Sequence, residues 1–358
     1  MRSAWARRGW GYEQMVPDLV TVGGLTIDNV IASDGAVALA RVGGNAAYSG
    51  VGALCFVETV GLVSMAVASY PEETLGRLVA NGFLLDGVTR SPVHLRYVEW
   101  FIYDDAGDRI ERHRSKPEDL ALAGFSDVRL SPDDVINWVE LLRSAPPPAE
   151  PSYSQFRHET PMTAKQVPAS YLKSRGVHLA PSRLDVLMEM ADLFSPANIP
   201  VTLDPGWQLA DVPLDDLAPL LAKVDAFLPS AVELAALVPG ASRHEALREL
   251  ACRCRGTVAV KLGRHGSLVW DRASSQPIAV PSLTVPAVDP TGAGDSWCGG
   301  FLAGLAETGE PIKAACFGSV AAARIVRHFG ADGALPVDKA ECRSDLDRLL
   351  ATPTPWSA

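Results

Sequence analysis

Short apolar runs alternate with helical patterns along the second half of this 358-residue chain, and this alternation limits the folds available to it. Helical patterns run from Leu184 to Phe194 and onward from Ala231. Candidate strands precede, separate and follow these helical patterns, at residues 177–179, 199–203, 226–228 and 258–262. A strand–helix–strand rhythm of this kind produces parallel strands with helices packed on both faces. The sequence therefore predicts an α/β fold with a doubly wound, mostly parallel sheet.

Polar residues and glycines follow the carboxyl ends of candidate strands. These clusters are Asp28, Asp204, Ser230 with Glu233, Gly263 with Gly266, and Asp295. Open parallel sheets bind ligands at the edge where their strands end. Because all of these clusters converge on that edge, we expect an active site there.

The loop Asp289-Pro290-Thr291-Gly292-Ala293-Gly294-Asp295 joins extended chain to an amphipathic helix. A helix N-terminus offers unsatisfied N–H groups and a positive dipole end to an anion, and small side chains allow the anion close to the backbone. Asp295 is unexpected in such a site, because a carboxylate repels bound phosphate. Its presence is explained if it accepts a proton from a hydroxyl that attacks the phosphate. The alternative is an ordinary glycine-rich turn capped by Asp.

This loop, followed by a small-residue helix, resembles the C-terminal signature of the ribokinase-like (PfkB) carbohydrate kinases. The N-terminal element of that family is matched by Gly23-Gly24, Asp28 and the Gly-Gly-Asn-Ala-Ala run at 43–47. The resemblance runs in consistent order over roughly residues 18–340, with Pro290 standing where the family more often has Thr. It implies ATP-dependent phosphorylation of a hydroxyl group on a sugar or sugar-like small molecule, with Mg²⁺ as the metal.

The resemblance also implies roles for individual residues. Asp295 is expected to be the general base, and the backbone of Gly292, Ala293 and Gly294 the anion hole. The residues expected to contact the acceptor's hydroxyl groups are Asp28, Gly43, Gly44 and Asn45. Structural alternatives are a Gly-Gly turn with an Asn cap, and a loop Asp that bonds its own backbone.

On the nucleotide side, the resemblance implies that Lys261, Gly263, Gly266 and Ser319 bind ATP, with Ser319 in the adenine pocket. A plain hairpin turn is the structural alternative at 263–266. Ser230 and Glu233 resemble an Asn-x-x-Glu motif whose Glu organises Mg²⁺ through water, although Ser230 has a shorter reach than Asn. A solvated carboxylate at a helix start is the alternative for Glu233.

Asp289 and Thr291 occupy positions where some family members bind a monovalent cation, so K⁺ is a candidate ligand there.

Residues 29–42 and 91–114 are expected to form a separate small sheet, in which 94–103 and 109–114 pair as a hairpin with a turn at 104–108. In the resembled family such a sheet is a lid over the sugar and often a dimer surface. We therefore expect a lid, and a homodimer formed through it. Its side chains Trp100, Phe101 and Tyr103 are candidates for setting specificity.

The lid also carries a basic run, Arg109, Arg112, His113 and Arg114. Such a run either receives a phosphorylated substrate or is a solvated strand face.

The domain boundaries expected from these assignments are a tail at 1–17, the kinase domain at 18–345 and a second tail at 346–358. Residues 116–154 form a stretch longer than the resembled family usually carries. A helix is expected within it, begun by Ser131-Pro132 and stopped by the prolines at 146–148.

The formal net charge of −10 argues against nucleic acid as the main partner, because nucleic-acid binders need basic surfaces. Apolar runs fall well short of the roughly 20 residues that span a bilayer, and residues 1–17 lack the apolar core of a signal peptide. The six cysteines lack paired metal-binding spacing, and Cys298 and Cys316 lie on apolar helix faces as expected for core thiols. We therefore expect a cytoplasmic protein with a small-molecule substrate.

Other functions fit the sequence less well. A dinucleotide-dependent oxidoreductase needs Gly-x-Gly-x-x-Gly after its first strand, where this chain has only Gly23-Gly24, and the Gly-x-x-x-x-Gly-Lys-Ser/Thr of P-loop NTPases does not occur. Two alternatives stay open: a nucleoside kinase of the same family, and a catalytically weak sugar-binding sensor on the same fold.

Overall fold

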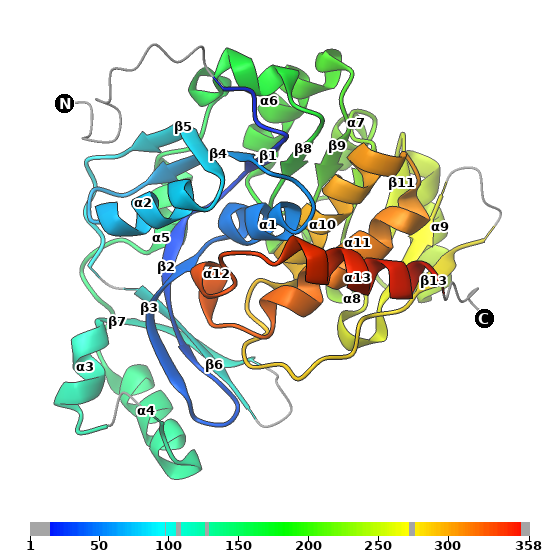
Figure 1. The fold of residues 1–358 in the computed structure, drawn as a ribbon. Coiled ribbons are helices and arrows are strands. Elements are labelled where there is room, and N and C mark those ends of the chain that lie inside the picture. Colours follow the sequence, from blue (N-terminus) through cyan, green and yellow to red (C-terminus); the bar gives the residue numbers. More distant parts are fainter. Residues whose placement is uncertain (1–14, 97, 105–108, 126–128, 272–275, 352–358) are drawn as a thin grey trace.

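The computed structural model describes residues 15–96, 98–104, 109–125, 129–271 and 276–351. Within them, a nine-stranded sheet lies between two layers of helices, and a smaller four-stranded sheet projects from its edge (Figure 1). The spatial order of the large sheet is β13-β12-β11-β10-β9-β8-β1-β4-β5. Its strands are Leu19–Val22 (β1), Val60–Ala66 (β4), Phe83–Arg90 (β5), Val177–Leu179 (β8), Val201–Leu203 (β9), Ala226–Phe227 (β10), Thr257–Lys261 (β11), Ser267–Trp270 (β12) and Ile278–Val280 (β13).

The strands from β5 to β11 pair in parallel, and β12 and β13 are antiparallel additions at one edge. Their near-continuous burial, complete along Leu19–Val22 and Thr257–Lys261, is what a sheet covered on both faces requires. This confirms the predicted fold class. The chain runs from β1 to β4 and β5 on one side and returns to β8 on the other, so β1 and β8 flank the point where strand order reverses. Ligands bind at such a point in open α/β sheets.

Helices cover the two faces in separate groups. One face packs against α1 (Asn45–Leu54), α2 (Glu72–Ala80), α10 (Ala293–Thr308), α11 (Pro311–Ile325) and α13 (Lys339–Leu350), and the other against α6 (Leu184–Phe194), α7 (Leu214–Leu221), α8 (Ala231–Leu237) and α9 (Arg243–Arg253). A short helix α12 spans Gly330–Gly333. Helix α13 runs past residue 345, the domain boundary expected from the sequence, because Leu346 and Leu349 are buried in the core.

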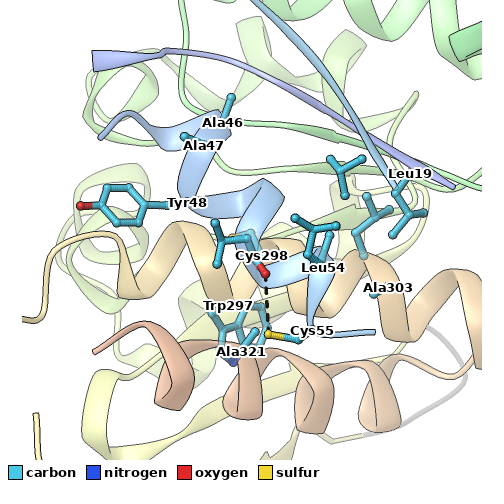
Figure 2. Close-up of a cluster of buried hydrophobic side chains, with 14 of the residues drawn as sticks. Leu19, Ala46, Ala47, Tyr48, Leu54, Cys55, Trp297, Cys298, Ala303 and Ala321 are labelled. Carbon is cyan, nitrogen blue, oxygen red and sulfur yellow. Dashed lines mark hydrogen bonds between the residues drawn. The ribbon is translucent and has the colours of Figure 1, made fainter. Parts of the chain in front are cut away.

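The packing of α1 against α10 places the start of α10 over the sheet. Figure 2 shows Leu54 of α1 on the side of Trp297, Cys298 and Ala303 of α10, while the ring of Tyr48 points away from them; all five side chains are buried. Trp297 stacks on Phe301 one turn later, with ring centroids 5.1 Å apart. The packing of α1 against α10 couples the motif at residues 289–295 to the N-terminal third of the chain.

The small sheet contains β2 (Thr26–Ile31), β3 (Val37–Gly43), β6 (Val98–Tyr103) and β7 (Arg109–Ser115) in the order β3-β2-β6-β7. This confirms the predicted separate sheet, although most of the expected turn, 105–108, lies outside the described residues. Side chains alternate between the two faces of a strand, so Phe101 and Tyr103 share one face of β6 while Trp100 and Ile102 share the other.

Residues 116–154, which we call the insertion, cover the outer face of this sheet with helices α3 (Pro117–Leu122) and α4 (Pro132–Ser144) (Figure 1). Helix α4 begins at Ser131, as predicted, with Ser131 and Asp134 capping each other's backbone. Trp138 of α4 meets the edge of Trp100, with ring centroids 5.4 Å apart, and Trp100 also donates a 2.6 Å hydrogen bond to Ser115 Oγ. The expectation that Trp100 sets specificity was therefore wrong, because its side chain is fully buried beneath α4.

After α4, the chain forms a third short helix, α5 (Tyr153–Glu159), before entering β8. Across the described ranges, none of the helices combines the length and apolarity needed to cross a bilayer.

Candidate active site

A cavity of about 920 Å³ opens at the carboxyl edge of the large sheet, beneath the inner face of the small sheet. Most of the residues expected in the active site line this one cavity: Asp28, Gly44, Asn45, Ser230, Glu233, Lys261, Gly263, Thr291, Gly292, Gly294 and Asp295. Phe101, Tyr103 and Arg109 line it from the small sheet. A second cavity of about 410 Å³ adjoins it and shares Ser230, Lys261 and Gly263.

Helix α10 begins at the cavity, and the glycine that precedes it is required on two grounds. Gly292 has φ +74°, a left-handed conformation that costs L-residues about 1–2 kcal/mol. A Cβ on Gly292 would also lie 2.2 Å from the ring of Tyr48. Gly294 borders open space, since a Cβ there would meet nothing nearer than Lys261 Nζ at 3.9 Å. The N–H of Ala293, expected in the anion hole, donates instead to the Pro290 carbonyl at 3.2 Å. The N–H groups of the next residues in the first turn lack intrahelical acceptors, so this end of α10 can still receive an anion.

Asp295 is the third residue of α10 and combines a half-buried carboxylate with a crowded acidic environment. Burial, with the negative charges of Asp204, Glu233 and Asp28, outweighs the attraction of Lys261 and raises the pKa of Asp295 to about 7. A carboxylate with this pKa exchanges its proton near neutrality, which suits a general base. Charged cavity walls and a shifted pKa are common features of active sites.

Lys261, at the end of β11, forms a buried ion pair with Asp204, which follows β9. Cys298 Sγ lies 3.4 Å from Lys261 Nζ and 3.4 Å from Asp204 Oδ2. Burial opposes the lysine's charge, but Asp204, Cys298 and Glu233 together raise the pKa of Lys261 above its ordinary value, so the amine is charged. Cys298 is buried as predicted, yet it contacts this ion pair and is not surrounded only by apolar groups.

Ser230 and Glu233 hold the start of α8 through a reciprocal capping box. Glu233 Oε2 accepts a 2.6 Å hydrogen bond from the Ser230 N–H, and Ser230 Oγ accepts one of 3.2 Å from the Glu233 N–H. This pairing gives Ser230 a structural reason to be Ser, because Ser is a strong N-cap. Burial and Asp204 raise the pKa of Glu233 against the opposing effect of Lys261.

The loop after β11 forms the wall between the two cavities. Gly263 lines both cavities, with φ +58° and open space where a Cβ would point. Gly266 is packed against the Val280 carbonyl, 2.1 Å from where its Cβ would lie. Ser319 is buried behind this loop and donates a 3.0 Å hydrogen bond to the Pro281 carbonyl.

Asp28 lies within β2, and not in a loop directly after β1 as the sequence suggested. It accepts a 2.8 Å hydrogen bond from Thr26 Oγ1 and packs on Gly43, where a Cβ would fall 1.8 Å from its Oδ2. Gly43 is therefore needed to make room for the Asp28 carboxylate and is not itself among the residues that line the cavity.

The amide of Asn45 joins two strand ends across the point where strand order reverses. Its Oδ1 accepts a 2.6 Å hydrogen bond from the Gly24 N–H, and its Nδ2 donates one of 2.9 Å to the Pro181 carbonyl. One N–H and one lone pair of the amide are left for a ligand.

Asp289 is fully buried at the base of the motif loop. Its carboxylate accepts hydrogen bonds from the N–H groups of Thr291, at 2.9 Å, and Gly330, at 3.4 Å. Thr291 Oγ1 hydrogen-bonds Tyr103 Oη at 2.7 Å, which ties the motif loop to the small sheet. Burial raises the pKa of Asp289 in spite of these hydrogen bonds.

Several cavity residues were not assigned a role from the sequence, among them Tyr48, Tyr153 and Arg157. Tyr48 supports Gly292, while Tyr153 and Arg157 reach the cavity from α5. Tyr153 Oη accepts a 2.9 Å hydrogen bond from the Leu25 N–H. Of these three residues, only Tyr48 could have been connected with the site from the sequence, because it follows Gly44-Asn45 by one helical turn.

Comparison with known proteins places this arrangement in a family. The family model described as pfkB family carbohydrate kinase matches residues 154–338, just over half of the chain. A cytidine kinase from Thermococcus kodakarensis is 24% identical over 297 residues, covering 83% of this chain and 91% of the kinase.

Solved structures share the fold over almost the whole chain. A Burkholderia thailandensis nucleoside kinase in complex with inosine has a TM-score of 0.68 at 16% identity, covering 94% of this chain and 99% of that one. An Arabidopsis thaliana ribokinase complexed with ribose and ATP has a TM-score of 0.64 at 19% identity, covering 93% and 99%. This chain belongs to the pfkB family of carbohydrate kinases.

Proposed function

We propose that the chain transfers the γ-phosphoryl group of ATP to a hydroxyl of a sugar or sugar-like small molecule, with Asp295 as the general base. The observation that carries this proposal is the position of Asp295. Its carboxylate lies in the first turn of α10, in the same cavity as Gly292 and Gly294, and has a pKa near neutrality. A site that only bound anions would gain nothing from a carboxylate placed there.

In this proposal the backbone N–H groups at the start of α10 stabilise charge on the transferring phosphoryl group. Lys261 is charged and lies beside Gly294, so it adds a positive charge at the same place. Phosphoryl transfer depends mainly on positioning and electrostatic stabilisation, and these groups supply both. Asp295 accepts the acceptor's hydroxyl proton as the oxygen attacks.

The acceptor is assigned to the end of the cavity near β1 and β8, where Asp28 and Asn45 offer hydrogen-bonding groups. The ATP base and ribose are assigned to the side near Gly263 and the second cavity. The small sheet closes over the acceptor through Phe101 and Tyr103, which limits access of water as the competing nucleophile.

Glu233 fits a role in holding Mg²⁺ through water, because it is a buried carboxylate facing a cavity that already contains Asp204 and Asp295. Mg²⁺ keeps several waters and takes few protein ligands in phosphoryl-transfer sites. When bound, it would neutralise negative charge on the phosphates. We assign K⁺ to Asp289 and Thr291. The cation would compensate the buried carboxylate of Asp289, which makes no ion pair with the described residues.

A nucleoside acceptor is the second candidate, favoured by the similarity to the cytidine kinase and to the inosine complex. A homodimer through the lid stays a prediction. In one chain the outer lid face is already buried by α3 and α4, so a dimer would have to use another part of the lid, such as its edge strands β3 and β7.

The test is ADP release over a panel of sugars and nucleosides with ATP and Mg²⁺. We expect ADP formation to depend on at least one acceptor. If acceptors raise the melting temperature while ADP release stays at the level without acceptor, the protein is a binding sensor and the kinase proposal fails.

A further inference from the structure

Arg157 brings an uncompensated positive charge to the acceptor end of the cavity. Its side chain is half-buried and lines the cavity, and it makes no ion pair among the described residues. The Nη2 group donates to the Pro181 carbonyl at 3.0 Å and to Ser182 Oγ at 3.1 Å, both of them neutral acceptors. A guanidinium carries five N–H donors, so most of its capacity is left for a ligand.

The helix that carries Arg157 is held in place on both sides. Phe156 is buried in the hydrophobic core that includes residues of α1 and α10, and Tyr153 Oη accepts a hydrogen bond from the Leu25 N–H. Gly24 allows the close approach, because the position of a Cβ there lies 3.2 Å from Arg157 Nη1 and 3.2 Å from Tyr153 Oη. The guanidinium is therefore positioned in advance, which lowers the entropy cost of binding a ligand.

The other arginines around this end of the cavity differ from Arg157. Arg183 is paired with Asp185 at 2.7 Å. Arg109 is exposed and lies over the ring of Phe101, 6.0 Å from its centroid. Arg157 is thus the cavity arginine best suited to a buried anionic group, because planar guanidinium groups bind phosphate and carboxylate in a bidentate way.

Shared hydrogen bonding puts Arg157 at the same end of the cavity as Asn45, which the proposed function assigns to the acceptor. Arg157 Nη2 and Asn45 Nδ2 both donate to the Pro181 carbonyl in the turn after β8, whereas the loop assigned to the ATP base and ribose follows β11, three strands further along the sheet. Adjacent strands are spaced by about 4.8 Å, which separates the two points by roughly 14 Å. We therefore assign a group that meets Arg157 to the acceptor, which shares this end of the cavity with Asn45.

We infer that Arg157 binds a phosphate or carboxylate carried by the acceptor, on the side away from the hydroxyl that Asp295 deprotonates. The acceptor is then an acidic sugar or nucleoside derivative. This inference rests on the proposed function, and it adds a substrate class that neither the motif loop nor the lid specifies.

The experiment compares matched acceptors with the full-length protein. The pairs are ribose with ribose 5-phosphate, glucose with gluconate, and cytidine with cytidine 5′-monophosphate. Binding is measured by calorimetry and turnover by ADP release, in wild type, Arg157→Gln, Arg157→Lys and the control Arg183→Gln. The phosphate and carboxylate pairs distinguish the two anions.

In wild type we expect the anionic member of at least one pair to bind more tightly. Arg157→Gln should reduce that preference by about 10- to 100-fold, through KM and Kd more than through kcat. Arg157→Lys should keep part of it. Arg183→Gln should change it by less than about threefold, because exposed ion pairs contribute little.

The inference is overturned if neutral and anionic members bind equally, or if Arg157→Gln weakens both equally, since a purely structural role would have that effect. Calorimetry separates this result from failure of the proposed function. If anionic acceptors bind through Arg157 and no ADP forms, the inference stands and the kinase proposal fails.

Discussion

Replacing Gly292 with Ala should damage both stability and catalysis, and Gly309 at the other end of α10 provides a matched control. Both glycines are left-handed, with φ +74° and +68°, so either Ala variant incurs about 1–2 kcal/mol of backbone strain. Only Gly292 also has a neighbour in the way, since its Cβ would lie 2.2 Å from the Tyr48 ring, whereas Gly309 has nothing within 4 Å. Overpacking of this kind costs about 1–3 kcal/mol.

The difference in unfolding free energy between Gly292→Ala and Gly309→Ala should therefore be about 1–3 kcal/mol, because the strain term is common to both. Urea unfolding followed by tryptophan fluorescence measures it. Gly292→Ala should also lower kcat by about 100-fold, since an ångström-scale displacement of Asp295 has that effect. Gly309→Ala should keep the wild-type kcat. Equal losses of stability in the two variants would refute the packing of Gly292 on Tyr48.

The remaining predictions concern protonation, the buried ion pair and the lid. Asp295 must lose its proton to act as a base, and its pKa is raised to about 7. The value of kcat/KM should therefore rise with pH, from about a tenth of its plateau at pH 6 to about half at pH 7. A profile that is flat from pH 5 to 8 would contradict this. Asp204→Asn leaves Lys261 buried without its partner and should cost about 3–5 kcal/mol of unfolding free energy, more than the double variant with Lys261→Met, as measured by urea unfolding. Trp138→Ala removes the ring that covers Trp100, so in steady-state assays it should raise the KM of the acceptor more than the KM of ATP. An equal rise in both KM values would count against a role of α4 in supporting the lid.

The fold could be predicted from the sequence because its signals are local and repeated. The helix from Leu184 to Phe194 has the predicted bounds, and α4 begins at the predicted cap. The strand expected at 199–203 starts only at Val201, after Pro200, whose missing N–H cannot join a ladder. Such differences concern the ends of elements and leave the topology unchanged.

The candidate site was predictable where a residue's role depends on its own loop. Gly292, Gly294 and Asp295 are placed by the start of one helix, so their motif was sufficient to bring them to the cavity. Trp100 was misassigned because alternation along a strand separates two faces without saying which of them an inserted helix will cover.

Roles that depend on contacts between distant segments could not be predicted. The ion pair of Asp204 with Lys261 joins residues 57 positions apart, and the contact of Arg157 with Ser182 depends on how the insertion returns to the sheet. The capping role of Ser230 did have a local signal, because Ser followed three residues later by Glu is a capping box. The family resemblance drew attention to the missing Asn instead.

The central claim is that Asp295 accepts the acceptor's proton, and the most direct test is the kcat of Asp295→Asn at saturating ATP and acceptor at pH 8. Asn keeps the shape of the side chain and removes the base, so kcat should fall by about 100- to 10,000-fold while the KM values change little. The variant should be at least as stable as wild type at pH 8. A carboxyl whose pKa is raised on folding contributes stability at low pH and loses it as pH rises through about 7. A well-folded Asp295→Asn with kcat within about threefold of wild type would contradict the account.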